Sequence, residues 1–335
     1  MNPIYSIINS LVIILALIVI PILGAGVAGL HTLFGVVIPY IAFFFFIISF
    51  IYRIVDWGKS AVPFRIPTTA GQQESLPWIK RSRLDNPSTT LGVIGRMILE
   101  VLFFRSLFRN TKTIYTPEGP KLSYGSSKWL WLGALAFHYS FFIIVLRHIR
   151  MFTSPMPFPF DWLDRLDSIL QIGVPLLYIS EIVIVGALIF LLLRRFFIST
   201  VRYVSLPADY FPLFLILAIV ISGILMRYFI RTDLISVKDL TMGLVTFHPK
   251  VSENIGTIFY VHLFLVCCLL VYFPWSKLMH MGGIFLSPTR NMANNNRMQR
   301  HINPWNYPVK VHTYEEWEDE FREVLKEAGI PVEKE

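Results

Sequence analysis

The apolar residues of this chain are gathered in long runs instead of being spread along it at a helical or strand period. Six runs of roughly 20 residues contain few charged side chains. An α-helix needs about 20 apolar residues to cross the hydrocarbon core of a bilayer, which is about 30 Å thick. We therefore predict six transmembrane helices: Ile4–Leu23, Leu33–Ile51, Trp129–Ile149, Ser168–Leu193, Phe211–Ile230 and Ile255–Leu278.

The polar segments between these runs divide the chain into four parts. Residues 1–55 hold two helices, 56–128 form a long polar loop, 129–280 hold a four-helix unit, and 281–335 form a hydrophilic tail. The first run lacks a basic flank and a small-residue cleavage site, so it is interpreted as a retained helix and not a signal peptide. The predicted fold class is an all-α integral membrane protein of about six transmembrane helices.

The distribution of Lys and Arg predicts the orientation of these helices. The segments on one side of the predicted bundle hold 21 basic residues and those on the other side hold five. Loops rich in Lys and Arg stay on the cytoplasmic side. Both termini, the long loop and the tail are therefore predicted to be cytoplasmic, in a multi-pass protein of the inner (cytoplasmic) membrane.

Two further amphipathic helices are predicted outside the spans. Leu91–Lys112 is apolar but carries five charges, which suits a helix lying at the cytoplasmic interface; a seventh span is the alternative. In the tail, Thr313 and Glu316 form a capping-box pattern and Gly329 gives a stop signal, which predicts a helix from about Tyr314 to Ala328.

Composition supports the membrane class and narrows the chemistry. The chain is 54% hydrophobic and 16% charged, whereas a soluble domain has about 25% charged residues. The net charge of +8 does not indicate nucleic-acid binding, because the basic residues flank the apolar runs. The basic, acid-free stretch Lys277–Tyr314 fits an acidic partner or lipid headgroups, or is simply solvated. The two cysteines, Cys267 and Cys268, are adjacent and match no disulfide, zinc or iron–sulfur pattern.

Four histidines in or beside the apolar runs are the main candidates for chemistry. His138 and His148 lie on the third predicted helix, and His262 and His280 lie on or just after the last. A histidine within hydrocarbon is costly unless it is bonded, so it is a functional candidate. It can serve as a haem ligand, a proton relay or a helix–helix contact. His31, His248, His301 and His312 lie in turns or in the tail and are not expected to be ligands.

The spacing of the four histidines favours haem. Ten residues separate His138 from His148, which is a rise of about 15 Å and leaves room for two stacked macrocycles. The third and last predicted helices run antiparallel, which pairs His138 with His280 at the cytoplasmic end and His148 with His262 at the outer end. The 18 residues from His262 to His280 rise about 27 Å, which is more than the rise between His138 and His148. Tilt, a kink at Pro274 or a bend must absorb the difference.

Charged residues near the outer end are candidates for a supporting role. Arg147 and Arg150 flank His148, and Arg227 and Arg231 end the fifth predicted helix. They are placed to bind haem propionates, or alternatively to snorkel to lipid headgroups. Glu181 is the acid well inside a predicted span, where it could serve a proton path or an interhelical hydrogen bond.

These histidine spacings resemble those of the respiratory nitrate reductase gamma subunit, a di-haem, quinol-oxidising cytochrome b. The chain looks still more like the cytochrome b subunit of the sulfite-reduction-associated Dsr complex and its relatives in heterodisulfide-reductase-like menaquinol complexes. Two segments carry that closer likeness: EVLFFRSLFRN (Glu100–Asn110) and SPTRNMANNNRMQRHINPWN (Ser287–Asn306). The nitrate-reductase likeness covers roughly Leu33 to His280, and the closer one nearly the whole chain.

The resemblance implies two b-type haems with the antiparallel ligand pairing given above. It also implies menaquinol oxidation near the outer haem and electron delivery to a cytoplasmic iron–sulfur subunit like the catalytic subunit of heterodisulfide reductase, in a complex of sulfur respiration with further membrane subunits. The extra first helix and the interfacial segment depart from the five-helix nitrate-reductase pattern. Two alternatives stay open: a haem-free anchor or proton-coupled transporter with histidine relays, and a di-haem cytochrome with a soluble donor.

Overall fold

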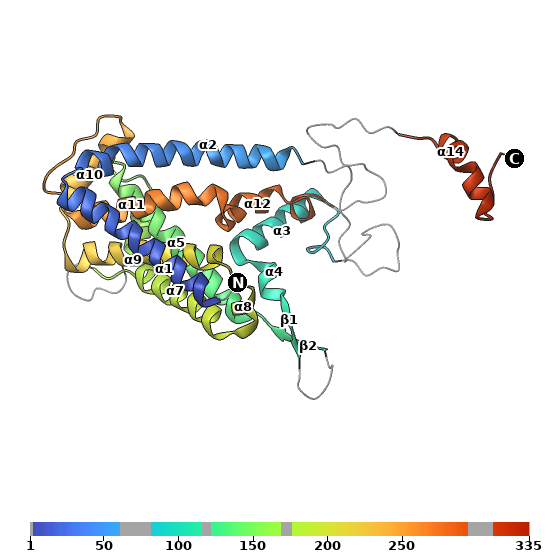
Figure 1. The fold of residues 1–335 in the computed structure, drawn as a ribbon, viewed down its shortest axis with the longest axis horizontal. Coiled ribbons are helices and arrows are strands. Elements are labelled where there is room, and N and C mark those ends of the chain that lie inside the picture. The colour runs from blue at the N-terminus through green and yellow to red at the C-terminus, as the bar shows by residue number, and fades with distance from the viewer. Residues whose placement is uncertain (1–2, 61–81, 116–121, 169–175, 294–310, 335) are drawn as a thin grey trace.

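A computed structural model describes residues 3–60, 82–115, 122–168, 176–293 and 311–334. Most of these residues are helical, and the long helices form one antiparallel bundle (Figure 1). The long helices of the bundle are α1 (Pro3–Pro21), α2 (Ile38–Gly58), α5 (Lys128–His148), α7 (Ile179–Phe197), α9 (Pro207–Ile224) and α11 (Thr257–Tyr272). The shorter helical elements are η1 (Ile22–Val27), η2 (Leu33–Val37), α3 (Thr90–Phe103), α4 (Arg105–Arg109), η3 (Ile149–Met151), α6 (Phe160–Asp167), α8 (Ser199–Val204), η4 (Leu225–Phe229), α10 (Leu234–Val245), η5 (Phe273–Trp275), η6 (Lys277–Met279), α12 (His280–Leu286), α13 (Pro288–Asn291) and α14 (Tyr314–Glu327).

Five helical stretches among the described residues are long and apolar enough to cross a membrane. Each contains one of the predicted spans or most of it and differs from it by a few residues at the ends. Together with membership of a membrane family, reported below, they make the chain a multi-pass membrane protein. The five stretches are Ile4–Val27, Leu33–Gly58, Lys128–Met151, Pro207–Phe229 and Thr257–Trp275.

The fourth predicted span in chain order, Ser168–Leu193, is not among these five stretches and differs from the structure. Helix α6 ends at Asp167, and α7 begins only at Ile179 and continues to Phe197. This 19-residue helix includes three charged residues, Glu181, Arg194 and Arg195, and it is not among the five candidate spans. Glu181 lies in the first turn of α7 and not well inside a span, because the described residues just before α7, 176–178, are not helical.

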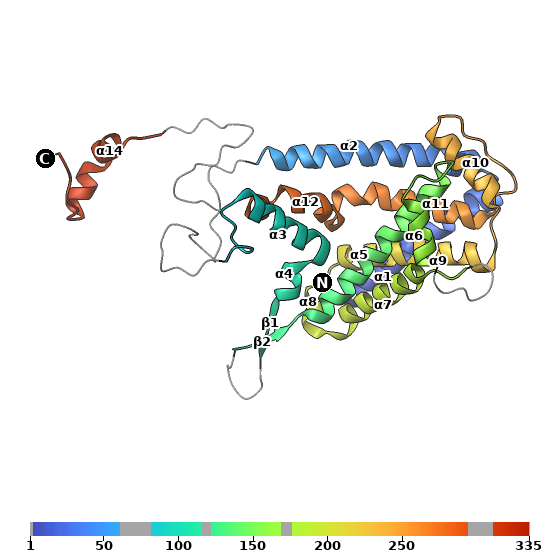
Figure 2. The same ribbon diagram turned by 180° about the vertical axis from the view of Figure 1, so that it is seen from behind.

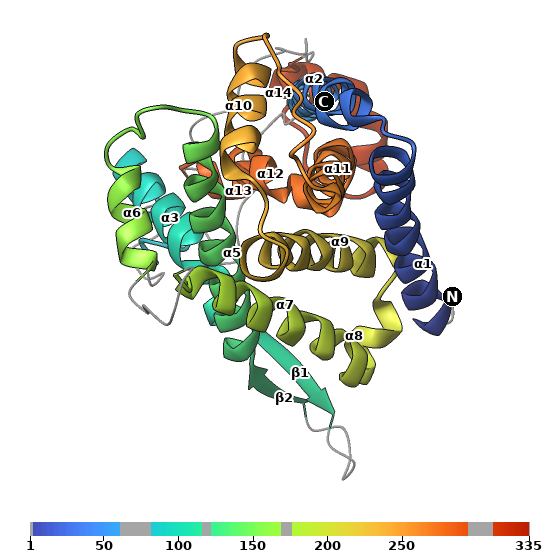
Figure 3. The same cartoon turned by 90° about the vertical axis from the view of Figure 1, so that its left-hand side faces the viewer.

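The helices are held together by apolar contacts between them, while many apolar side chains face outward. Helix α5 packs on α7, α7 on α9, and α9 on α1 and α11, which also packs on α2 (Figure 3). Leu188, Leu215 and Leu265 are fully buried between these helices. By contrast, Ile48 and Phe142 are at least 60% exposed. An apolar exterior on a bundle of this kind is suited to lipid.

The two ends of the bundle differ. At one end lie the turn between α1 and α2, together with α6 and α10 (Figures 1 and 2). At the other end lie the N-terminus, α3, α4, α8 and α12. The first end corresponds to the side predicted to be outer, and the second to the side predicted to be cytoplasmic. We call them the outer end and the inner end.

The polar loop contains more structure than the single interfacial helix predicted for Leu91–Lys112. Helix α3 has 14 residues, and Phe104 then adopts a left-handed conformation (φ 49°) that separates it from α4. A two-stranded antiparallel sheet follows, in which β1 (Thr111–Tyr115) pairs with β2 (Leu122–Ser126). Because α3 spans only about 21 Å, it does not support the seventh span. The hairpin is an addition to the all-α class.

The tail helix agrees with its sequence signals. Helix α14 covers Tyr314–Glu327, and Thr313 and Glu316 form the reciprocal hydrogen bonds of a capping box. Gly329 follows with a left-handed backbone (φ 69°), which an L-side chain adopts only with strain. The prediction of 314–328 is therefore confirmed to within one residue.

Candidate functional site: two histidine pairs

The outer histidine pair consists of His148, the last residue of α5, and His262, in the second turn of α11. Their rings lie 6.3 Å apart, centre to centre, and are nearly parallel, at 9°. His148 Nδ1 lies 2.7 Å from the carbonyl oxygen of Ile144. His262 Nδ1 lies 2.9 Å from Ser222 Oγ and 3.1 Å from the Ile219 oxygen, both on α9.

The inner histidine pair consists of His138, in the middle of α5, and His280, the first residue of α12. Their ring centres are 5.9 Å apart, and the rings are nearly perpendicular, at 86°. His138 Nδ1 lies 2.7 Å from the Ala134 oxygen, and His280 Nδ1 lies 2.7 Å from the Lys277 oxygen. The structure thus forms both pairs that the antiparallel argument predicts.

These two pairs fit the axial ligand positions of haem. An imidazole nitrogen bonds a transition metal at about 2 Å, so two imidazoles on opposite sides of one iron have ring centres roughly 6 Å apart. All four Nδ1 atoms face a backbone carbonyl oxygen, which is the usual outer-shell contact of a metal-bound histidine and leaves Nε2 for the metal. No group of three or more His, Cys, Asp or Glu side chains suited to a metal ion occurs among the described residues. A porphyrin needs only two protein ligands, because it supplies four nitrogens itself.

Helices α5 and α11, which carry three of the four paired histidines, pack on different neighbours. Helix α5 packs on α7, whereas α11 packs on α9, α1 and α2. Helices α5 and α11 are not a closely packed pair in the described structure (Figure 3). Helix α9 packs on both α7 and α11 and contacts His262 through Ser222 and the Ile219 oxygen.

His280 reaches the inner pair because the last span does not continue as one helix. Helix α11 ends at Tyr272, the η5 turn contains buried Pro274, and Ser276 is extended before η6 begins. A helix that ran unbroken from His262 would place His280 about 27 Å along the axis. The predicted kink is thus a full interruption with two 3-10 turns, and it removes the mismatch with the spacing on α5.

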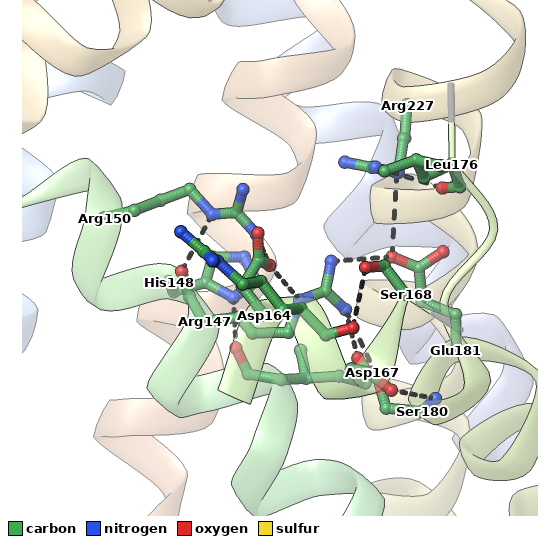
Figure 4. A network of polar contacts seen from close by, with 12 residues as sticks. Arg147, His148, Arg150, Asp164, Asp167, Ser168, Leu176, Ser180, Glu181 and Arg227 are labelled. Atoms are coloured by element: carbon green, nitrogen blue, oxygen red, sulfur yellow. Dashed lines mark hydrogen bonds and ion pairs between the residues drawn. The ribbon is translucent and has the colours of Figure 1, made fainter. Parts of the chain in front are cut away.

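Beside the outer pair lies a polar network that joins α5, α6, α7 and η4 (Figure 4). Arg147 is 6% exposed and forms ion pairs with Asp167 at 2.8 Å and Asp164 at 3.2 Å. Arg150 forms a further ion pair with Asp164. Ser180 donates to Asp167 through its backbone N–H at 2.8 Å and through its hydroxyl at 2.5 Å. We call this set of residues, with Glu181, Tyr228 and Arg227, the outer polar network.

Glu181 links this network to the end of α9. Tyr228 donates a 2.6 Å hydrogen bond to Glu181 Oε2, while Arg147 and Arg227 lie 3.6 and 4.0 Å from Oε1. The interhelical hydrogen bond predicted for Glu181 is therefore present. The guanidinium groups of Arg147 and Arg227 also stack on the ring of Tyr178, at 3.1 and 4.2 Å from its centre.

The predicted propionate contacts of Arg147 and Arg227 stay predictions. Both guanidinium groups point into the bundle instead of snorkelling, and Arg147 is already paired with three carboxylates. Arg227 donates to the Leu176 oxygen at 3.1 Å, but its Nε, 4.0 Å from Glu181 Oε1, has no hydrogen-bond partner among the described residues. Of the two, Arg227 is the one with an unused donor.

The other described histidines lie outside both pairs. His31 stacks on Tyr260 with ring centres 5.1 Å apart, and His248 Nδ1 lies 2.7 Å from the Thr246 oxygen. His312 is exposed in the tail, and His301 lies outside the described residues.

Several residues of the site were not found from sequence. Ser222 supports His262 and is a polar residue within an apolar helix, which is the signal that could have singled it out. Asp164 and Asp167 lie on the short helix α6, and the sequence does not reveal that α6 packs back onto α5. Phe104 packs edge-on against His138, with ring centres 5.0 Å apart, and nothing in its sequence context marks that contact.

Comparison with known proteins supports the resemblance given above. A protein 49% identical over 280 residues, which cover 82% of this chain and 83% of the relative, is the Hdr-like menaquinol oxidoreductase cytochrome b-like subunit of Archaeoglobus fulgidus. The subunit of the same name from Archaeoglobus profundus is 42% identical over 80% of this chain and 81% of its own length.

A family model, described as the nitrate reductase gamma subunit, matches residues 92–300. The match begins later than the expected Leu33 and extends beyond His280, so it includes α3, α4 and the start of the tail. It contains all four paired histidines and covers more than half of the chain. Together with the two relatives, this match shows that the chain belongs to the nitrate reductase gamma subunit family.

Proposed function

We propose that this chain is a membrane di-haem cytochrome b that transfers electrons between menaquinol and a cytoplasmic iron–sulfur subunit of a sulfur-metabolism complex. The observation that carries the proposal is the presence of two histidine pairs at haem-ligand spacing, at two depths of one bundle. Family membership and the names of the two Archaeoglobus relatives support the cytochrome and menaquinol parts.

The chain's own residues supply ligands, spacing and surroundings. His138 and His148 are ten residues apart on one continuous helix, so the two sites are separated by about 15 Å along the axis. When bound at these pairs, b-type haem supplies one-electron redox chemistry. The backbone carbonyls of Ala134 and Ile144 hold the α5 imidazoles in the tautomer that presents Nε2.

The outer polar network supports menaquinol oxidation on the outer side. Quinol oxidation releases protons, and a proton acceptor must lie within reach of the quinol hydroxyl. Glu181 is the acid that the network brings to α7 beside the outer pair, and Tyr228 and Arg227 hold its carboxylate in place. We assign Glu181 the role of proton acceptor. The Tyr228 hydroxyl and the Arg227 guanidinium are assigned the role of orienting it.

The inner end suits an electron acceptor on the cytoplasmic side. The charge distribution predicts that α3, α4, the hairpin and the tail are cytoplasmic. Phe104, between α3 and α4, packs against His138, and the tail begins directly after His280. An iron–sulfur subunit like the catalytic subunit of heterodisulfide reductase is the proposed acceptor, in a complex of the inner membrane that serves sulfite or other sulfur respiration. Further membrane subunits complete that complex.

The test is the haem content and reduction of the purified protein. The chain is expressed in a host that supplies haem, and the haem per chain is measured together with the reduced-minus-oxidised spectrum. We expect two b-type haems per chain that a menaquinol analogue reduces. A colourless protein would overturn the cytochrome assignment in favour of an anchor or transporter. Haems reduced by dithionite but not by quinol would instead indicate a soluble electron donor.

A further inference from the structure

Arg96, on α3, is a buried arginine outside the spanning helices. It is 4% exposed, and it donates to the Arg290 oxygen through Nε at 3.0 Å and to the Met292 oxygen through Nη2 at 3.3 Å. Its Nη1 donates to the Asp85 oxygen at 3.0 Å. A buried guanidinium is costly unless its donors are satisfied. Arg96 is therefore committed to the backbone on both sides of it.

Glu100 completes this connection from the same face of α3. It is 5% exposed and forms a 2.9 Å ion pair with Arg290, while the backbone N–H of Ser106 donates to it at 3.2 Å. Val93, Arg96 and Glu100 are buried at spacings of three and four residues, which places them on one helical face. Helix α3 is thus joined to α13 by Arg96, which contacts the backbone of Arg290, and by Glu100, which contacts the Arg290 side chain.

Helix α13 follows α12, and α12 begins with His280 of the inner pair. The other side of α12 packs closely on α2: a Cβ added at Gly282 would lie 3.1 Å from Ile54 Cδ1. Helix α12 is only seven residues long, so it has little stability of its own. Its position is therefore fixed by α2 along one side and by Arg96 and Glu100 at its end.

The same extramembrane segment also contacts the other inner histidine. Phe104, between α3 and α4, packs edge-on against the His138 ring at 84° and 5.0 Å between ring centres. Tyr139 and Trp131 of α5 donate to the oxygens of Leu102 and Phe103 at 2.9 and 2.7 Å. Phe104 has a left-handed backbone (φ 49°), a conformation that is strained for a residue other than glycine and persists only where surrounding contacts impose it.

We propose that α3, Phe104 and α4 form a strap that sets the orientation of the two inner imidazoles relative to each other. In this strap Arg96 is the positioning residue for His280, and Phe104 is the positioning residue for His138. The proposal rests on the proposed function, because the orientation matters chemically only if both rings bind one iron. The outer pair lies on α5 and α11 and has no such strap among its described contacts.

The test compares variants of the whole chain with both haems bound. The electron paramagnetic resonance signal of a low-spin ferric haem depends on the angle between its axial imidazole planes, and the midpoint potential depends on ligand orientation. Arg96→Met removes the donors at similar volume, and Arg96→Lys restores the charge without the planar fork. Arg202→Met is the matched control, because Arg202 is an exposed arginine on α8 at the same end of the bundle and donates to the Phe196 oxygen, not to the strap or α13.

We expect Arg96→Met to shift the signal and the potential of the inner haem while those of the outer haem stay unchanged. Arg96→Lys should recover part of the shift, and Arg202→Met should show none. An unchanged inner haem in Arg96→Met, or an equal change of both haems, would overturn the strap. Wild-type protein without haem would overturn the proposed function instead, so the two failures are distinguishable.

Phe104→Gly keeps the proposal testable if Arg96→Met does not accumulate. Glycine accommodates a left-handed backbone without strain, so this change removes the ring from His138 without threatening the fold. We expect a shift of the inner haem signal only. An inner haem with the wild-type signal in this variant would refute the strap by itself.

Discussion

The outer and inner histidine pairs are similar in spacing and different in construction. The outer rings are nearly parallel and both are carried by spanning helices, and His262 is also supported by the neighbouring helix α9. The inner rings are nearly perpendicular, and one of them is carried by the short helix α12 after two 3-10 turns. The outer pair is thus fixed by the packing of the bundle, whereas the inner pair depends on contacts from extramembrane segments.

In the proposed function, this difference separates proton chemistry at the outer end from partner contacts at the inner end. The acids Asp164, Asp167 and Glu181 gather at the outer end, among the arginines of the outer polar network (Figure 4). The inner pair is flanked instead by Phe104 and by the strap that reaches α13. Acids beside the outer pair would accept the protons of quinol, and the strap beside the inner pair would face the proposed acceptor subunit.

The largest expected effect is the loss of one haem at a time. His148→Ala should remove the outer haem and His280→Ala the inner one, because each iron loses an axial ligand that nothing else nearby replaces. The haem content should fall from about two per chain to about one, measured as the pyridine haemochrome. His248→Ala is the control, since His248 is exposed away from both pairs. Loss of both haems in either ligand variant would show that the pairs are not independent.

The next largest effect concerns the acid of the outer polar network. Glu181→Gln keeps a hydrogen-bond acceptor for Tyr228 but removes the proton acceptor, so haem reduction by a menaquinol analogue should slow by on the order of 10²-fold. Stopped-flow absorbance measures this rate. Reduction by dithionite should be unaffected. Glu253→Gln, an exposed acid in the loop before α11, is the control, and an equal slowing there would remove the specific role of Glu181.

A smaller effect is expected at the support of His262. Ser222→Ala deletes one of two contacts to Nδ1, and the Ile219 oxygen at 3.1 Å remains. Removal of a hydrogen-bond partner of a metal-bound histidine typically changes metal affinity by roughly tenfold or more. Because one partner of His262 remains, the rate of haem loss from the outer site should rise by less than about tenfold. Transfer of haem to apomyoglobin measures this rate. Ser140→Ala is the control, because Ser140 bonds the backbone of its own helix. A faster loss of the inner haem in Ser222→Ala would contradict the assignment of Ser222 to the outer pair.

The smallest effect tests the polar anchoring of the strap by pH. Hydrogen bonds from Arg105 and Arg109 hold the pKa of Asp85 well below its ordinary value. The stabilisation is therefore present above about pH 4 and is lost as the pH falls below that through the folded pKa. Protection of residues 90–109 from amide exchange should fall by about fivefold or less, while α9 and α11 stay protected.

In the Asp85→Asn variant this protection should already be lower at pH 7 and should change little on acidification. If wild type and variant show the same pH dependence, Asp85 does not anchor the strap.

The sequence predicted much of this architecture for identifiable reasons. Uninterrupted apolar runs are a strong signal, so five spans were found to within a few residues at their ends. The pairing of His138 with His280 and of His148 with His262 followed from the number of crossings, which fixes the direction of each helix. The capping box at Thr313 likewise acts within a few residues and was confirmed.

Features that depend on distant contacts were not predicted. The start of α7 at Ile179 was missed because the apolar run before it is continuous with the helix in composition. The β1–β2 hairpin depends on the pairing of two separate strands, and the left-handed Phe104 depends on hydrogen bonds between the residues before it and α5. The partners of Arg147 come from α6 and α7, up to 34 residues further along the chain.

The sequence by itself determined five long apolar helices and which histidines meet, because those properties depend on apolar length and on the order of crossings. Only the tertiary structure decided how the rings are oriented and what holds them. Ring orientation depends on the break after Tyr272 and on side chains brought together from separate helices. Those contacts join residues far apart in the chain, and no local pattern encodes them.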